Sequence, residues 1–386
     1  MSYIELTTPC IFGVESILKK EIIKLGYEIK RVEDGRITYI ADELGVCRSN
    51  IWLRTAERVM INVGEFTATS FEELFDKTKD LPWERWIPQD GKFWVKKASS
   101  IKSKLFSPSD IQSIIKKAIV ERLKKTYHVN WFNEDGEHYP IRVFIKKDRV
   151  SICLDTSGEA LHKRGYRTFT SKAPISETLA AAIIQLSPWN KDRILVDPFC
   201  GSGTIPIEAA MIAMNMAPGL DREFTAEKWK NIIPVKSWFK AVDEANDVID
   251  TTCELNIAGY DIDYKVLKLA RENVRNAGVE DKIHFQERDM RKTSNNKKYG
   301  FIITNPPYGE RLGDKETVIE LYKDMKITFD KNLEDWSYFI ITSFDEFERY
   351  FGKNADKKRK LYTGMMKANL YQYFGSKPPK RVNPIN

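Results

Sequence analysis

The sequence predicts an α/β protein, with an open α/β sheet in the C-terminal half and two smaller α+β units before it. Two observations carry this prediction. In the C-terminal half, short apolar runs lead to acidic or amide residues, and a glycine-rich turn follows the first run and enters a helical pattern. In the N-terminal part, short strand-like and helix-like segments alternate closely, which is typical of small α+β units.

The composition excludes several classes of protein. Hydrophobic residues make up 42% of the 386 residues and charged residues 30%, which is typical neither of disordered nor of membrane proteins. The N-terminus lacks a basic segment followed by an apolar one, and no apolar run approaches the roughly 18 residues of a membrane span. We therefore expect a cytoplasmic protein without a membrane partner.

The cysteines and histidines indicate neither a disulfide framework nor a metal centre. The five cysteines form no Cys-x-x-Cys pair, and the four histidines lack the spacing of metal ligands. We expect no bound metal. Cys200 lies inside the glycine-rich turn, where packing is a commoner role for a free cysteine than nucleophilic catalysis.

The first unit has the predicted order βαββαβ. Its clearest elements are strands at 4–7, 36–41 and 58–67 and helices at 13–25 and 42–50. A split βαβ topology is one arrangement that this order allows.

The second unit has its own set of elements. The pattern predicts a helix at 70–79, a strand at 93–98, a helix starting near Pro108, and strands at 141–146 and 150–155. This order completes a second small α+β unit.

The second unit also carries a basic segment with aromatic residues. Between residues 92 and 125 there are ten Lys or Arg residues and two acids, together with Phe93, Trp94 and Phe106. This mixture is typical of surfaces that bind nucleic acids. A solvated helix face gives the same charge pattern, so the segment alone leaves the partner open.

The third part begins with a nucleotide-type cradle. A helix is expected over residues 173–184, with Pro174 near its start and Pro188 as its stop, and then a strand at 193–197, a turn at 198–204 and a helix at 205–216 follow one another. By itself, the turn does not identify which ligand is bound. It lacks the Gly-Lys-Ser/Thr of a Walker loop and the full Gly-x-Gly-x-x-Gly of dinucleotide enzymes.

Further strand ends carry acids. A strand ends at Asp261 before a helix at 264–277, and a strand at 283–286 leads to Asp289. A carboxylate at the second strand tip is placed to accept ribose hydroxyls, and Asp289 can accept from an adenine amino group. Each acid alone is also typical of a helix cap or loop.

The fourth strand end carries a rigid polar corner, Asn305-Pro306-Pro307-Tyr308. The Asn305 side-chain oxygen and the Pro306 carbonyl can accept both hydrogens of an aromatic amine and favour a pyramidal, nucleophilic nitrogen. The two prolines fix the backbone. Tyr308 offers a flat face for an extruded base. Asn-Pro and Pro-Pro are also common in ordinary turns, so the corner alone leaves both interpretations open.

The remaining pattern completes the C-terminal sheet. It predicts a helix at 317–329, a strand at 336–342 and an antiparallel pair at 358–362 and 367–374.

These motifs resemble an enzyme family. The turn at 197–204, combined with the corner at 305–308, is similar to the S-adenosylmethionine (SAM)-dependent amino-methyltransferases. The insert at 217–255 resembles that of bacterial large-subunit rRNA guanine-N2 methyltransferases and related tRNA enzymes, whose motif Glu310 and Arg311 also match. The resemblance implies a Rossmann-like class I methyltransferase domain with SAM as cofactor.

The N-terminal half resembles an RNA-binding module. The segments at 107–112 and 155–167 are similar to THUMP domains fused to methyltransferases, and the preceding residues are similar to the ferredoxin-like domain that accompanies THUMP. The resemblance implies a ferredoxin-like domain at 1–66, a THUMP domain at 67–167 and a methyltransferase domain at 168–386.

The resemblance also implies roles for individual residues. The catalytic residues are Asn305, Pro306 and Tyr308. The cofactor-binding residues are Asp197, Phe199, Cys200, Gly201, Gly203, Thr204, Asp261, Ile262, Asp289 and Met290. The expected RNA contacts are Lys96, Lys102, Lys104, Lys116, Lys117, Lys163, Arg164 and Arg167.

We therefore expect a SAM-dependent methyltransferase that modifies an exocyclic amino group of structured RNA, with guanine N2 of 23S rRNA or of tRNA as the favoured target. An adenine-N6 DNA methyltransferase shares the chemistry of the corner, but we find no DNA-reading domain. A non-catalytic RNA-binding assembly protein would be expected to have lost Asn305 or the glycine turn, and both are intact. The sequence leaves the oligomeric state open.

Overall fold

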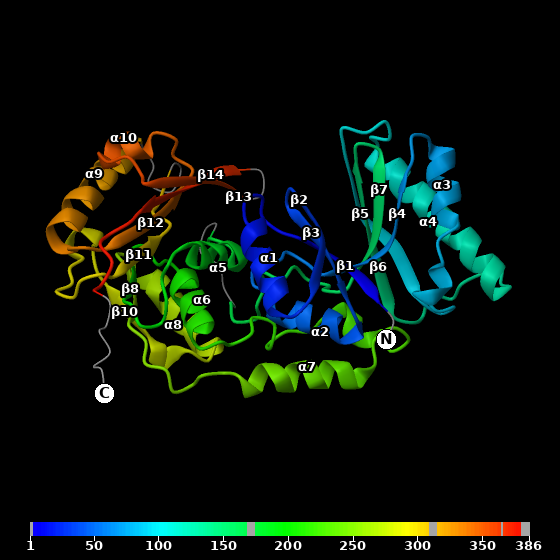
Figure 1. Cartoon of the computed structure of the whole chain (residues 1–386), viewed down its shortest axis with the longest axis horizontal. Helices are drawn as coiled ribbons and strands as arrows, with labels where there is room; N and C mark the ends of the chain where they lie inside the picture. Colours follow the sequence, from blue (N-terminus) through cyan, green and yellow to red (C-terminus); the bar gives the residue numbers. More distant parts are fainter. Residues whose placement is uncertain (1–2, 168–173, 309–314, 364–365, 380–386) are drawn as a thin grey trace. The chain divides into compact units, whose positions relative to one another are not determined.

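Two seven-stranded sheets organise the chain (Figure 1). The computed structural model describes residues 3–167, 174–308, 315–363 and 366–379. Within these ranges, no helix is long and apolar enough to span a bilayer. The predicted α/β class is confirmed.

The N-terminal sheet begins with the predicted order βαββαβ. Its elements are β1 (Ile4–Pro9), α1 (Glu15–Lys24), β2 (Glu28–Glu33), β3 (Arg36–Ala41), α2 (Glu43–Trp52) and β4 (Met60–Thr67). The start of α2 is fixed by Asp42, whose side chain accepts a hydrogen bond from the Gly45 amide at 2.7 Å. Leu6 of β1 and Ile37 of β3 are fully buried, and their polar neighbours Thr7 and Thr38 are buried as well, so these strands are covered on both faces rather than half-buried.

The same sheet continues through the second predicted unit. Its elements are α3 (Phe71–Lys79), β5 (Lys92–Ile101), α4 (Pro108–Tyr127), β6 (His138–Lys146) and β7 (Arg149–Asp155). The helix α4 begins where the sequence predicts, because the Ser107 side chain caps it and Pro108 occupies its first turn. Ile111, Ile115 and Ile119 are buried on one face of this helix.

The two predicted α+β units share one sheet. Its order is β2-β3-β1-β4-β7-β6-β5, and β4 pairs antiparallel with both β1 and β7. The boundary predicted after residue 66 falls at the end of β4. Local periodicity does not encode which strands pair, so the sequence did not reveal this continuity.

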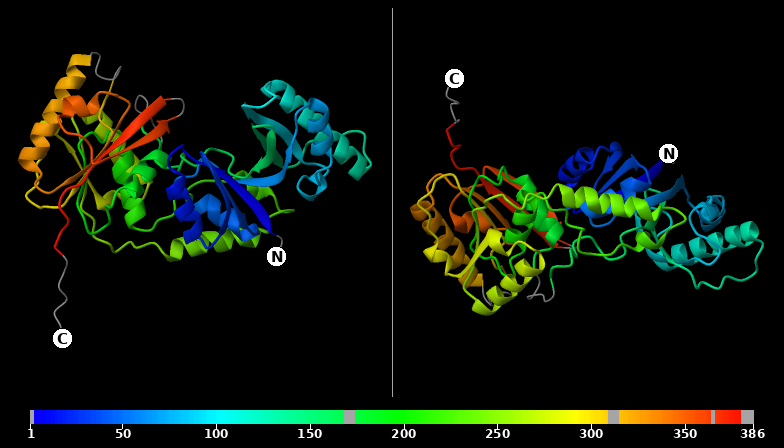
Figure 2. Two further views of the ribbon diagram at one scale, coloured as in Figure 1. Left: turned by 45° about the horizontal axis from the view of Figure 1, so that its top comes forward. Right: turned by 90° about the horizontal axis from the view of Figure 1, so that it is seen from below.

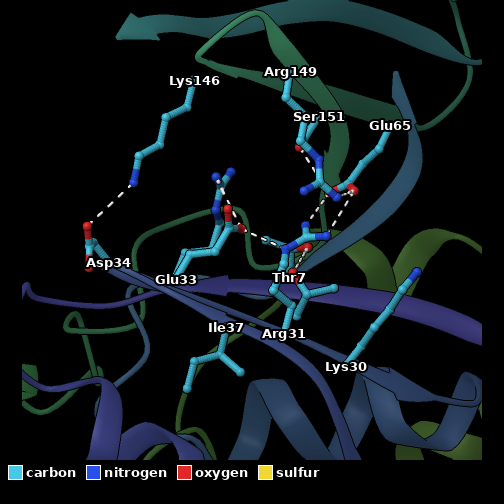
Figure 3. A network of polar contacts seen from close by, with 12 residues as sticks. Thr7, Lys30, Arg31, Glu33, Asp34, Ile37, Glu65, Lys146, Arg149 and Ser151 are labelled. Atoms are coloured by element: carbon cyan, nitrogen blue, oxygen red, sulfur yellow. Dashed lines mark hydrogen bonds and ion pairs between the residues drawn. The ribbon is translucent and has the colours of Figure 1, made fainter. Parts of the chain in front are cut away.

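Glu65 of β4 ties β2 to β7 (Figure 3). Its carboxylate accepts hydrogen bonds from the Arg31 guanidinium at 2.5 and 3.2 Å, from Arg149 at 2.5 Å and from the Ser151 hydroxyl at 3.1 Å. Burial opposes the charge, but the hydrogen bonds from Arg31 and Arg149 outweigh it and lower the pKa of Glu65 to about 2. The carboxylate therefore stays ionised and joins strands from both predicted units.

The contacts divide the chain into two compact units. The first comprises Met1–Cys10, Leu18–Leu161 and Arg222–Asp247, and the second comprises Ile11–Ile17, His162–Asp221 and Val248–Asn386. Most of the insert predicted at 217–255 thus belongs to the first compact unit rather than to the unit that holds the C-terminal sheet.

Specific contacts anchor the insert within the first unit. Its helix α7 (Val235–Asp247) lies beside α2 in both views of Figure 2, and Arg48 of α2 pairs with Glu244 of α7 through two hydrogen bonds of 2.7 Å. Trp229 stacks on Tyr139 with ring centroids 5.0 Å apart. The Trp229 indole also donates to the His138 carbonyl at 2.9 Å.

The second sheet has the order β10-β9-β8-β11-β12-β14-β13. The elements of this part are α5 (Glu177–Leu186), β8 (Leu195–Asp197), α6 (Thr204–Ala213), β9 (Ile257–Asp261), α8 (Tyr264–Asn276), β10 (Ile283–Glu287), β11 (Phe301–Thr304), α9 (Lys315–Asn332), β12 (Ser337–Thr342), α10 (Phe347–Phe351), β13 (Lys357–Thr363) and β14 (Met366–Tyr373). Strands β8 to β12 are parallel, and β13 and β14 form the predicted antiparallel pair.

Both faces of this sheet are buried. Ile303 of β11 belongs to a core shared with α5, α6 and α8, whereas its neighbour Ile302 belongs to a core shared with α9 and α10. Side chains that alternate between two cores explain the continuous apolar run of β11. The sheet is therefore doubly wound, and the carboxyl ends of its parallel strands lie at one edge.

Trp229→Ala tests the anchoring of the insert. Because Trp229 is fully buried, we expect a loss of about 3–5 kcal/mol in the stability of the first unit, visible as a lower unfolding temperature. Trp131→Ala is the matched control, since Trp131 is 81% exposed. Equal unfolding temperatures for the two variants, measured by calorimetry, would contradict this account.

Candidate active site

Polar residues gather at one edge of the C-terminal sheet. β8 ends at Asp197 and β9 at Asp261, while Asp289 follows β10 and Asn305 follows β11. The four strands are parallel neighbours, so their carboxyl ends meet at the same edge. Open α/β folds bind their ligands at this edge. The predicted convergence of the four strand ends is confirmed.

The turn between β8 and α6 leaves space beside its backbone. Gly201 has a φ of +53°, a left-handed conformation that favours glycine, and a Cβ added there would meet no atom within 4 Å. The turn enters α6 at Thr204, and the first amides of a helix are free to bind a ligand. A polar ligand can therefore approach this backbone closely.

Asp261 at the tip of β9 faces the same turn. Its Oδ2 accepts a hydrogen bond from the Gly201 amide at 3.0 Å, and its Oδ1 accepts one from the Asp263 amide at 3.0 Å. A carboxylate has about four acceptor positions, so these hydrogen bonds leave acceptor capacity for a ligand hydroxyl. Burial raises the pKa of Asp261 despite these hydrogen bonds. The adjacent Ile262 side chain is 69% exposed and offers an apolar surface beside the carboxylate.

Asp197 connects β8 to β11. Its Oδ1 accepts hydrogen bonds from the Thr304 hydroxyl at 2.6 Å and from the Phe199 amide at 3.1 Å. The side chain is buried, and burial raises its pKa to about 7. Asp197 therefore helps to hold the two central strand ends together, and its contact with a cofactor stays a prediction.

The corner at Asn305 follows Thr304 directly. Asn305 and Tyr308 are half-buried, and Pro306 is buried. The Pro307 carbonyl accepts a hydrogen bond of 3.4 Å from the hydroxyl of Tyr322, which also lies 3.1 Å from the Thr342 hydroxyl. The backbone after Asn305 is thus held from the α9 side. Glu310 and Arg311 lie outside the described residues.

Comparison with protein families accounts for almost the whole chain. Residues 164–372 match a family described as an RMKL-like methyltransferase domain, residues 68–155 match the THUMP domain, and residues 5–60 match the RlmL ferredoxin-like domain. The chain belongs to the RMKL-like methyltransferases. The resemblances that the motifs indicate are confirmed, whereas the boundaries set after residues 66 and 167 stay a prediction.

Individual relatives extend this family assignment. The chain is 45% identical over 376 residues to the "Putative RNA methyltransferase YpsC" of Bacillus subtilis, and the match covers 97% of each chain. It is 34% identical over 389 residues to the "Ribosomal RNA large subunit methyltransferase K/L" of Shewanella pealeana. That match covers 97% of this chain and 53% of the relative, so the chain spans about half the length of such relatives.

Solved structures of related methyltransferases have the same fold. A possible methylase from Clostridium difficile shares 55% identity with a TM-score of 0.95, and the match covers 98% and 100% of the two chains. A "predicted N6-adenine-specific DNA methylase" from Listeria monocytogenes shares 44% identity with a TM-score of 0.91 and 97% coverage of both. SMU.472, a putative methyltransferase complexed with SAH, shares 42% identity with a TM-score of 0.92. The match covers 98% of this chain and 100% of that chain.

Two residues of the glycine turn have structural roles in this methyltransferase. Cys200 is buried, and burial raises the pKa of its thiol well above the ordinary value, which disfavours the nucleophilic thiolate. The hydroxyl of Thr204 accepts a hydrogen bond of 2.5 Å from the Arg167 guanidinium. Cofactor contacts of their backbone atoms stay a prediction, as do those of Phe199 and Gly203.

The structure does not support the expectation that Arg164 and Arg167 contact RNA. The Arg164 side chain is 2% exposed and pairs with the fully buried Glu208 at 3.4 Å. Arg167 pairs with Glu177 at 3.3 Å besides its contact with Thr204. Both guanidinium groups are committed inside the protein. In a basic run the sequence gives no sign of burial, and the matching acids lie on other elements.

Asp289 and Met290 follow β10. The Asp289 side chain accepts a hydrogen bond from the Arg291 amide at 2.9 Å and pairs with the Arg291 guanidinium at 3.1 Å. Met290 is buried against the same sheet. Asp289 thus behaves as a turn cap, the alternative that the sequence left open, and its contact with an adenine stays a prediction.

The expected lysine contacts lie on the surface. All of them are exposed, namely Lys96, Lys102, Lys104, Lys116, Lys117 and Lys163. Lys116 lies 3.9 Å from Glu134, and Lys117 lies over the Phe75 ring. Exposure permits RNA binding, and the contacts themselves stay a prediction.

Sequence reasoning missed three residues that support the site. Thr304 and Tyr322 hold the corner, and Glu208 neutralises Arg164. Thr304 was visible as the one polar residue that ends the apolar run of β11. Tyr322 and Glu208 lie on helical patterns that give no signal for such long-range contacts.

The raised pKa of Asp197 predicts a pH dependence of stability. Between about pH 4 and 7 the folded protein retains a proton that the unfolded chain loses, so this residue's contribution falls as pH rises, by up to about 4 kcal/mol. Asp197→Asn keeps the Oδ1 acceptor but does not titrate. The free energy of unfolding in urea is measured for the variant and for the wild type. The variant should gain stability relative to the wild type between pH 5 and pH 8, and an equal difference between the two proteins at both pH values would refute the prediction.

Proposed function

We propose that this chain is a SAM-dependent RNA methyltransferase that modifies an exocyclic amino group, with guanine N2 of large-subunit rRNA or of tRNA as its target. The observation that carries the proposal is the amine-binding corner at Asn305 beside the glycine turn at Gly201. The two belong to neighbouring parallel strands, β11 and β8. Transfer between a cofactor and a nucleobase needs both groups at one edge.

The residues at the turn fit SAM. Gly201 leaves room for a ligand, Asp261 keeps acceptor positions for ribose hydroxyls, and the exposed Ile262 can cover an adenine ring. The related SMU.472 is described in complex with SAH, the demethylated form of this cofactor. When bound, SAM supplies an electrophilic methyl group and a neutral thioether leaving group.

The corner would prepare the amine for attack. The Asn305 side-chain oxygen and the Pro306 carbonyl accept the two hydrogens of the amine, which withdraws its lone pair from the aromatic ring. Tyr322 holds the next carbonyl, at Pro307, so the backbone cannot rotate freely. Tyr308 stacks on the extruded base. Positioning then supplies much of the rate acceleration.

A strong general base is not needed at this site. The nitrogen carries a positive charge after methylation and loses a proton readily to water. Cys200, whose thiol is buried with a raised pKa, serves neither as nucleophile nor as base. The chemistry of the described residues is therefore sufficient for a direct transfer.

RNA is the favoured substrate because of features of the first compact unit. It contains the THUMP match at 68–155 and the exposed lysines from Lys96 to Lys117. Relatives named rRNA large-subunit methyltransferases match nearly the whole chain, although the chain spans only about half of them. The activity of those longer proteins is therefore extended to this chain as a proposal.

An adenine-N6 DNA methyltransferase is the second candidate. The Listeria structure carries such a description in its name, and an adenine amine fits the Asn305 corner as well as a guanine amine does. An assembly protein without catalytic activity is disfavoured, because Asn305 and the glycine turn are both intact.

Asn305→Ala tests the role of the corner. We expect kcat for methyl transfer to RNA to fall by about 100-fold or more, since an orienting hydrogen-bond acceptor is lost. Binding of SAH, measured by calorimetry, should change by less than about twofold. Asn354→Ala is the matched control, because Asn354 is an exposed asparagine of the same unit. Loss of SAH binding in Asn305→Ala would give Asn305 a structural role instead.

The nature of the substrate is tested with labelled SAM and nucleic acids from a strain that lacks the gene. We expect label in rRNA or tRNA, recovered as N2-methylguanosine by mass spectrometry of the nucleosides. Label that enters DNA as N6-methyladenine and not RNA would replace the proposal with the second candidate.

A further inference from the structure

We propose that Phe12 and Tyr362 form a stacking surface for an unpaired base of the RNA that flanks the target nucleotide. The inference rests on the proposed function, because it takes RNA as the substrate. It adds a binding surface for a neighbouring nucleotide to the corner that holds the target. Both residues belong to the second compact unit.

Strand register places Tyr362 at the edge where the corner lies. Thr304 of β11 is level with Ile340 of β12, and Thr342, two residues further along, is level with Asn369 of β14. Asn369 pairs with Lys360, so Tyr362 lies two residues beyond that level. The ring is therefore carried at the edge reached by Asn305 rather than at the opposite end of the sheet.

The lateral separation suits a short stretch of RNA. The order β11-β12-β14-β13 puts three strand spacings between the corner and Tyr362. At about 4.8 Å a spacing this is roughly 14 Å laterally, whereas neighbouring stacked nucleotides of a duplex strand lie only about 3.4 Å apart. A base near the target, but not adjacent to it, can reach the ring.

The loop that carries Phe12 is fixed against β13. Gly13 has a φ of +92°, and a Cβ there would lie 2.6 Å from the Lys360 carbonyl oxygen, so only glycine permits this approach. The Arg359 guanidinium donates to the Gly13 carbonyl at 2.9 Å. The Gly13 amide in turn donates to the Glu15 carboxylate at 3.0 and 3.1 Å. The backbone that follows Phe12 is thus held in place before any ligand binds.

The two rings form a pair that is left open to solvent. Their centroids lie 5.5 Å apart with an interplanar angle of 82°. Phe12 is 46% exposed and Tyr362 is 37% exposed. Aromatic side chains held at this exposure offer flat surfaces on which any base can stack.

The charge around the pair suits a phosphate backbone. Residues 357–373 contain five Lys or Arg residues and no acid. Lys358 pairs with Glu348 and Lys367 with Asp345, whereas Lys360 is exposed near the pair. Lysines on an edge strand also prevent pairing with other chains, so the charge supports the proposal without carrying it. The rigid, exposed aromatic pair carries it.

The test compares KM for RNA across single variants, with rRNA from a strain lacking the gene as substrate. Phe12→Ala and Tyr362→Ala should raise KM for RNA by about 5- to 100-fold, the range for loss of one stacked base. Tyr362→Phe keeps the ring and should remain within about twofold. Phe374→Ala is the matched control, since this exposed aromatic follows the opposite end of β14.

Binding of SAH by calorimetry separates stacking from folding. It should be unchanged in every variant, because neither ring contacts the glycine turn. If wild-type protein labels RNA and both alanine variants keep its KM, the stacking surface is wrong and the proposed function stands. If SAH binding falls together with RNA methylation, the rings are structural and the proposal is overturned. If wild-type protein labels no RNA, both fail.

Discussion

The pairing of β8 with β11 is the constraint on which the site depends. It brings the glycine turn after Asp197 next to the rigid corner at Asn305, and the Thr304 hydroxyl bridges the two strand ends with a 2.6 Å hydrogen bond to Asp197. Because that carboxylate is buried, the bond forms where water does not compete with it. Strand pairing alone would align the backbones; the bond also fixes the residue that precedes Asn305.

The first compact unit is held together by different interactions. Its strands form one sheet, and Glu65 uses an ionised carboxylate to hold arginines from β2 and β7. The insert adds α7 through the pair between Arg48 and Glu244. The exposed lysines of α4 and β5 thus lie in the same compact unit as most of the ferredoxin-like part. Since the chain alternates between the two compact units, neither unit is a single contiguous stretch of sequence.

Much of this arrangement is predictable from local patterns. The strand ends at Asp197, Asp261 and Asn305 were visible because apolar runs stop there, and parallel strands must then bring them to one edge. The resemblance of the motifs supplied the family, which the comparisons confirm. Contacts between distant elements were not visible: the continuity of the first sheet through β4 and the burial of Arg164 against Glu208 depend on tertiary pairing. The assignment of individual site residues remains a proposal.

A crystal structure with SAH and a guanosine-containing RNA tests the central claim most directly, through the distance from the Asn305 side-chain oxygen to the target amine. The account predicts a hydrogen bond of about 2.6–3.2 Å, with the SAH ribose on Asp261. A target amine held by other residues, or SAH bound away from the turn at Gly201, would contradict it.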